Sequence, residues 1–212
     1  MEKKEIIDLF KEKFQYLYIT RDQIILEEQI SSLEKIESDI SKTRKQYILE
    51  RNEEYANLWL SFECAIKSIE NGLRMFIFLK KGDPDNAWDC LVDAQNNASW
   101  SMIAHEFNKE IQLGYISFFN EIEKWLFPPQ TFVSTSMIVG HSECSICKKD
   151  MLECNHIRGQ CYMGEFCSEI VTKIERWNHV AIVSHPADKR CRNTHIGHSP
   201  KQNLMTLKMD EE

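Results

Sequence analysis

Apolar residues recur at helical spacing through most of the first 127 residues. From Met1 to Asn71 the chain has neither glycine nor proline, and residues that favour helices dominate. One apolar stripe with three- and four-residue spacing has charged residues between its members and consists of Leu26, Ile30, Leu33, Ile36 and Ile40. This pattern predicts an amphipathic helix with one face toward a core.

A second helical run, roughly Tyr47 to Lys80, carries more large apolar side chains and is expected to be the central, most buried helix. Gly82 then breaks the pattern, and Asp83 is placed to cap a following helix with Pro84 in its first turn. That helix is expected from Pro84 to about Phe107, and another from about Glu110 to Phe127. Short connections between long amphipathic helices predict an antiparallel, up-and-down bundle.

The pattern changes at Pro128-Pro129. Residues 131–139 (TFVSTSMIV) are rich in β-branched side chains and alternate, which predicts a strand, and the apolar run 179–183 is suited to pair with it. Residues 168–177 regain helical spacing and are expected to form a helix. The expected fold is therefore mainly α, with a helical bundle over 1–127, a small α+β module over 128–200 and a flexible tail over 201–212.

Cysteine and histidine are concentrated in this second part, which holds six of the eight cysteines and six of the seven histidines. Cys144 and Cys147 form a Cys-x2-Cys turn that supplies two soft metal ligands at once. Cys154, His156 and Cys167 follow, so five candidates compete for four tetrahedral positions. We expect one structural Zn²⁺ held by the turn with His156 and Cys167, and Cys154 as the first substitute.

A strand, a Cys turn, a ligand-bearing loop and a helix starting at Cys167 would make the module treble-clef-like. The alternative is a set of unligated, buried thiols. Cys161 is expected to be a bystander. A second, looser group, formed by Cys191, His195 and His198 near His185, either holds another metal ion or belongs to a solvated surface tail.

The stretch CSICKKDMLECNHIRGQCYMGEFC (residues 144–167) resembles a zinc-knuckle segment of assorted bacterial and phage-derived proteins, with the pattern Cys-x2-Cys…Cys-x-His-x2-Gly…Gly-x2-Cys. The following WNHVAIVSHPAD is similar to a stretch that accompanies it in some phage-like sequences. The resemblance spans residues 144–191 and implies metal binding and a mobile-element or phage-defence setting. Residues 1–127 carry no such resemblance.

The same segment also resembles HNH endonucleases, which implies a metal-dependent nuclease with His156 as the base. This chain departs from that family's pattern, because Asn155 stands where an acidic residue or a histidine is usual. The later asparagine and histidine residues also do not fall at the family's intervals.

The distribution of charged residues changes at the same point as the pattern of apolar residues, after Phe127. Residues up to Phe127 contain 16 Lys and Arg against 23 Asp and Glu, whereas the remainder contains 10 of each. An acidic bundle repels phosphate backbones, so any nucleic-acid contact is expected only from the C-terminal module. The basic residues there are Lys189, Arg190, Arg192, Lys201 and Lys208.

The N-terminus has no apolar run of the secretory type, and no apolar stretch is long enough to span a bilayer. We therefore expect a cytoplasmic protein with reduced thiols and no membrane contact. Glu153 and Glu165 flank the cysteine cluster, but their spacing nominates neither as a catalytic base. The leading expectation is a non-enzymatic, zinc-stabilised interaction or scaffold protein with a protein partner.

Overall fold

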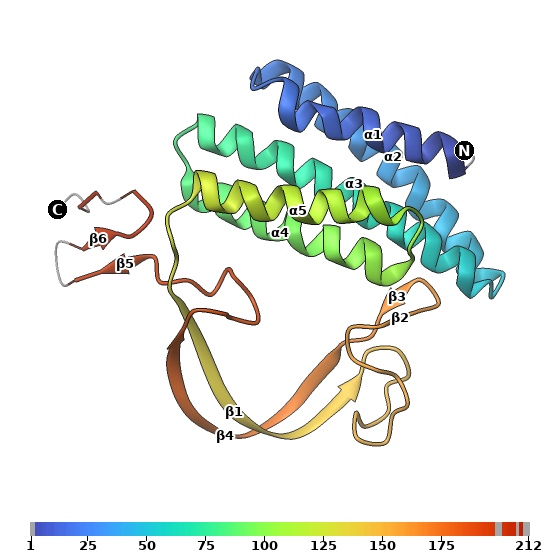
Figure 1. Ribbon diagram of the computed structural model, residues 1–212. Helices are drawn as coiled ribbons and strands as arrows, with labels where there is room; N and C mark the ends of the chain where they lie inside the picture. The colour runs from blue at the N-terminus through green and yellow to red at the C-terminus, as the bar shows by residue number, and fades with distance from the viewer. Residues whose placement is uncertain (1–2, 198–200, 207, 210–212) are drawn as a thin grey trace.

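Five helices and a long two-stranded ribbon make up most of the computed structural model, which describes residues 3–197, 201–206 and 208–209 (Figure 1). Consecutive helices run in opposite directions, as expected for an up-and-down bundle. The helices are α1 (Lys3–Ile19), α2 (Gln23–Leu49), α3 (Glu53–Lys80), α4 (Pro84–Ala104) and α5 (Lys109–Leu126). The prediction of a mainly α chain is confirmed.

The helix predicted from Tyr47 to Lys80 is divided between α2 and α3. Arg51 adopts a positive φ of 57°, and the Asn52 side chain caps α3. Asp22 caps α2 in the same way after α1 ends. These two breaks use a capping side chain rather than glycine or proline, so apolar spacing alone did not reveal them.

The third capping site was predicted and is confirmed. The backbone N–H of Asn86 donates to Asp83 Oδ1 at 3.1 Å, and Pro84 occupies the first turn of α4. Asp83 thus satisfies a backbone donor that the first turn leaves without an intrahelical partner.

The core lies around α3, which contacts each of the other four helices. Phe62 packs its ring against Phe10 of α1 and against Phe107, with ring centroids 5.6 and 4.9 Å apart. At Gly72 the helices approach so closely that a Cβ would lie 2.7 Å from the Phe119 ring and 2.9 Å from Leu17. The expectation that the central helix is the most buried is confirmed.

The ribbon consists of β1 (Phe132–Cys144) and β4 (Glu169–Val183), paired antiparallel along their lengths. Phe132 lies opposite Val183, so the predicted strand pairs with the apolar run 179–183 as expected. Several register shifts interrupt the pairing, which is a usual cause of bending. The ribbon curves away from the bundle as an arch, and most of β4 is exposed (Figure 1).

The helix predicted over 168–177 is wrong, because residues 169–177 belong to β4. Their apolar residues fit helical spacing, but Ile170, Val171 and Ile174 are β-branched and favour a strand once a partner strand is present. The treble-clef-like arrangement required that helix and is not supported.

Both ends of the arch contact the bundle. At one end the short strands β2 (Cys161–Tyr162) and β3 (Glu165–Phe166) lie beside the α2–α3 junction (Figure 1). At the other end the chain beyond β4 returns to α4, where the Trp88 Nε1–H donates to the Lys189 carbonyl at 2.9 Å. β5 (His195–Ile196) then pairs with β6 (Gln202–Asn203).

The flexible tail expected over 201–212 stays a prediction. Of these residues, 201–206 include β6 and Met205, which is 9% exposed and belongs to the main apolar core. Residues 207 and 210–212 lie outside the described residues. Within the described part of the chain, no helix combines the length and apolar character that a membrane crossing requires.

Candidate metal centre

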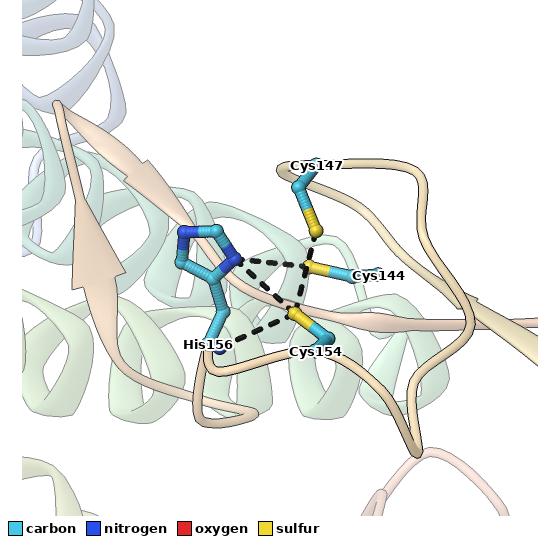
Figure 2. A group of neighbouring side chains, drawn as sticks. All are labelled: Cys144, Cys147, Cys154 and His156. Carbon is cyan, nitrogen blue, oxygen red and sulfur yellow. Dashed lines mark hydrogen bonds between the residues drawn. The ribbon is translucent and has the colours of Figure 1, made fainter.

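Four of the five predicted ligands converge at the end of β1. Cys144 is the last residue of that strand, Cys147 lies in the turn that follows, and Cys154 and His156 come from the next loop (Figure 2). One ligand atom from each residue lies within 4.8 Å of the other three. Three thiols and one imidazole therefore surround a common point.

The separations are those of a compact tetrahedral site. The His156 Nδ1 atom lies 3.2 Å from Cys154 Sγ and 3.7 Å from Cys144 Sγ, and Cys147 Sγ lies 3.4 Å from Cys154 Sγ. Ligand atoms bound tetrahedrally to one ion at about 2.0–2.3 Å would be separated by roughly 3.5–3.8 Å. The side chains need only small adjustments to hold one ion.

Backbone N–H groups point at two of the thiols. The Ile146 N–H donates to Cys144 Sγ at 3.4 Å, and the His156 N–H donates to Cys154 Sγ at 3.2 Å. Desolvation acts to raise the pKa of Cys144, but hydrogen bonds from the backbone N–H groups of Cys147 and Ile146 and from the neighbouring thiols together lower this pKa below its ordinary value. Desolvation and the neighbouring thiols raise the pKa of Cys154.

Cys167 lies beside the group rather than within it. Its thiol is buried and its Sγ atom is 3.7 Å from Cys144 Sγ, but it does not belong to the set of four mutually close ligands. The set that the structure brings together thus contains Cys154 where the sequence favoured Cys167. That preference depended on a helix start at Cys167, whereas the residue lies between β3 and β4.

The bundle contacts β2 and the β2–β3 turn, which follow the candidate metal ligands, through side chains that the sequence did not reveal. The Asn57 side-chain oxygen accepts hydrogen bonds from the Gly164 N–H at 2.6 Å and from the Cys161 thiol at 3.0 Å. Arg44 donates to the Gly164 carbonyl at 2.7 Å and to Glu63 at 2.9 Å. Arg44 and Asn57 each lie more than 100 residues before Gly164 in the sequence, so no local pattern marks them as its partners.

Gly164 is required at this junction for two reasons. Its φ is +73°, and an added Cβ would lie 3.2 Å from the Ala56 side chain of α3. Cys161, expected to be a bystander, lies outside the group of four, and burial raises its pKa to about 11. It therefore acts as a neutral hydrogen-bond donor to the bundle.

The second group expected from the sequence, Cys191 and His195 with His198 near His185, does not form a cluster among the described residues. In that part of the chain, the group at Cys144 is the one set of three or more potential ligands found close together. Cys191 is exposed, and the ring nitrogens of His195 contact Thr194 and Asn203. The His185 Nδ1 atom forms a hydrogen bond with the Ser184 hydroxyl at 2.9 Å. His198 lies outside the described residues.

Three of the basic residues of the C-terminal module form ion pairs with the bundle. Lys189 lies 2.5 Å from Glu123 and Arg190 lies 3.1 Å from Asp93. Arg192, whose side chain is 3% exposed, pairs with Asp85. Each pair joins the returning C-terminal segment to α4 or α5, so the acidic surface of the bundle neutralises this stretch.

Comparison with protein-family models, with curated proteins and with solved structures gave no match to this chain.

Proposed function

We propose that Cys144, Cys147, Cys154 and His156 bind one structural Zn²⁺. The observation that carries the proposal is the convergence of three thiol sulfurs and one imidazole nitrogen within 4.8 Å. This donor set suits Zn²⁺, whose structural sites are tetrahedral and use cysteine and histidine. A site filled by four protein ligands leaves no position for a substrate, which argues for a structural rather than a catalytic ion.

The ion would crosslink two segments of the chain at one end of the arch. Binding would join the end of β1 to the loop that leads into β2 and β3, and those strands contact the bundle through Asn57 and Arg44. At the other end, the pairs made by Lys189, Arg190 and Arg192 hold the returning chain. A two-stranded ribbon is marginally stable alone, so fixing both ends should make it a persistent feature.

An interaction or scaffold role follows from what the arch exposes. Trp177 and Ile182 of β4 are 61% and 74% exposed, and no further strand pairs with the outer edge of β4 in the described residues. The outer edge of β1 is bridged near its two ends by Arg192 and Asp150. Exposed apolar side chains and free strand edges are surfaces that proteins use for contacts with other proteins. The proposed partner is therefore a protein, and the resemblance of residues 144–191 suggests a mobile-element or phage-defence setting.

The nuclease alternative requires His156 to be free to activate water. In the structure its Nδ1 atom faces the Cys144 and Cys154 thiols (Figure 2). A histidine bound to the structural ion through this nitrogen is neither mobile nor basic enough to serve as the base. The geometry favours the ligand role.

Metal analysis of the purified protein tests the proposal. We expect one zinc per chain in the wild type, and loss of stoichiometric zinc in Cys154→Ser. The matched control is Cys167→Ser, which removes a buried neighbouring thiol outside the group of four and should retain the metal. Retention by Cys154→Ser together with loss from Cys167→Ser would assign the fourth position to Cys167 and contradict the proposed site.

The functional class needs a separate measurement. Wild type and His156→Ala are incubated with plasmid DNA and Mg²⁺, and the wild type is used as bait in its native lysate. Recovery of a specific protein that the Trp177→Ser ribbon variant fails to capture supports the interaction role. Cleavage by the wild type and not by His156→Ala would overturn it in favour of the nuclease.

A further inference from the structure

A cavity of about 580 Å³ opens between α1, α3 and α5. Its lining residues lie toward the C-terminal ends of these three helices. These helix ends are at the end of the bundle away from β2 and β3 (Figure 1). Its apolar lining comes from Leu17, Phe76, Leu79, Phe118, Ile122 and Leu126. This volume and lining fall within the range of natural small-molecule sites.

A single cation without a carboxylate partner stands at this cavity. Arg21, in the turn between α1 and α2, lines the cavity with its guanidinium carbon 3.7 Å from the centre of the Phe76 ring. No ion pair joins Arg21 to any carboxylate of the described residues, and its Nη1 donates to the Thr20 carbonyl at 2.7 Å. Partial burial lowers the pKa of Arg21, but a guanidinium stays charged at neutral pH.

The acidic groups near the cavity already have other partners. Glu121 also lines the cavity, but its carboxylate pairs with Lys124 at 2.7 Å. The Lys80 ammonium contacts the Arg21 carbonyl, which adds a second positive charge next to the cavity. Asp22, the residue after Arg21, caps α2 by accepting hydrogen bonds from the backbone N–H groups of Ile24 and Ile25.

We propose that this cavity binds an unbranched apolar monocarboxylate, a fatty-acid-like anion. The carboxylate would pair with the guanidinium of Arg21, which matches its planar geometry and can donate two parallel hydrogen bonds. The chain would lie along the apolar lining, and a volume of this size suits roughly ten to fourteen carbons. A cationic head is disfavoured, because it would lie against the Arg21 guanidinium.

Gly114 provides a means of closing the cavity without disturbing the core. It lines the cavity from α5, and a Cβ added there would meet no atom within 4 Å. A larger side chain at this position therefore extends into the open space. Ser117, an exposed residue one turn further along the same helix, offers a second position for the same purpose.

Calorimetric titration of the protein as purified tests the proposal. The probes are dodecanoate, dodecyltrimethylammonium and dodecyl maltoside, each below its micellar concentration, which share the apolar chain and differ in the charge of the head. We expect saturable 1:1 binding of dodecanoate, at least tenfold tighter than that of the ammonium compound. Arg21→Gln should weaken dodecanoate at least tenfold and leave the maltoside unchanged.

The filling variants Gly114→Leu and Ser117→Phe should each abolish binding of dodecanoate, and circular dichroism will show whether each remains folded. Lys109→Gln, on an exposed position at the other end of α5, should bind as the wild type does. Absence of saturable dodecanoate binding would overturn the proposal, as would equal affinity for the ammonium compound. Binding of an acidic amphipathic peptide in place of dodecanoate would overturn it in favour of a protein-docking site.

Discussion

Arg44 joins α2 to Gly164 in the β2–β3 turn, and Arg44→Ala should destabilise the protein by about 3 kcal/mol. Its Nε atom lies 2.9 Å from Glu63 and its Nη1 donates to the Gly164 carbonyl at 2.7 Å. The Arg44 side chain is 17% exposed and that of Glu63 is 8% exposed. The pair is therefore largely shielded from water and from salt.

The magnitude follows from what the substitution leaves behind. Removing one partner of a buried ion pair typically costs about 3–5 kcal/mol, because the remaining charge is buried without compensation. Lys67 lies 3.0 Å from the other oxygen of Glu63 and still balances part of that charge, which lowers the expected cost. Loss of the charged hydrogen bond to Gly164 adds roughly 1.5–3 kcal/mol, although the two costs are not additive.

Urea unfolding followed by circular dichroism measures this cost, with Lys42→Ala as the matched control. Lys42 also belongs to α2 and pairs with Asp39, but the two side chains are 73% and 79% exposed, so its loss should cost less than about 0.5 kcal/mol. A loss below about 1 kcal/mol for Arg44→Ala, or equal losses for both variants, would refute the idea that burial makes this pair important.

Three further predictions concern the packing, the site and its junction with the bundle. Gly72→Ala should destabilise the protein by about 1–3 kcal/mol because its Cβ would clash with neighbouring helices, whereas Gly114→Ala, which meets nothing, should stabilise it by up to about 1 kcal/mol in thermal unfolding. Zinc binding at pH 7 should release protons, because the pKa of Cys154 is raised and its thiol must lose a proton to bind the ion. The affinity for zinc should therefore fall as the pH falls. Calorimetric titrations in buffers of different ionisation enthalpy measure the proton release, and a binding enthalpy that does not depend on the buffer would contradict it. Asn57→Ala should cost about 1–2 kcal/mol and speed amide exchange at Gly164, whose N–H it leaves without that acceptor; unchanged exchange would contradict the role of Asn57 in docking.

Much of the bundle was accessible from the sequence because helices form from local interactions. The apolar stripe from Leu26 to Ile40 lies within α2, and the cap at Asp83 begins α4 where the sequence placed it. The cysteine turn was equally visible, because Cys144 and Cys147 are only three positions apart and a turn of that length brings both thiols to one ion. All five predicted ligands lie at or beside the site.

The tertiary structure decided what depends on partners distant in the chain. Residues 168–177 have apolar spacing that suits a helix, and pairing with β1 makes them a strand. Cys167 lies beside the group of four, which contains Cys154 instead. Lys189, Arg190 and Arg192 suggested a nucleic-acid surface by their composition, but their contacts with α4 and α5 neutralise them. The sequence alone determined the helices and the ligand types because both depend on near neighbours, whereas strand pairing and ion pairing across about a hundred residues depend on how the whole chain packs.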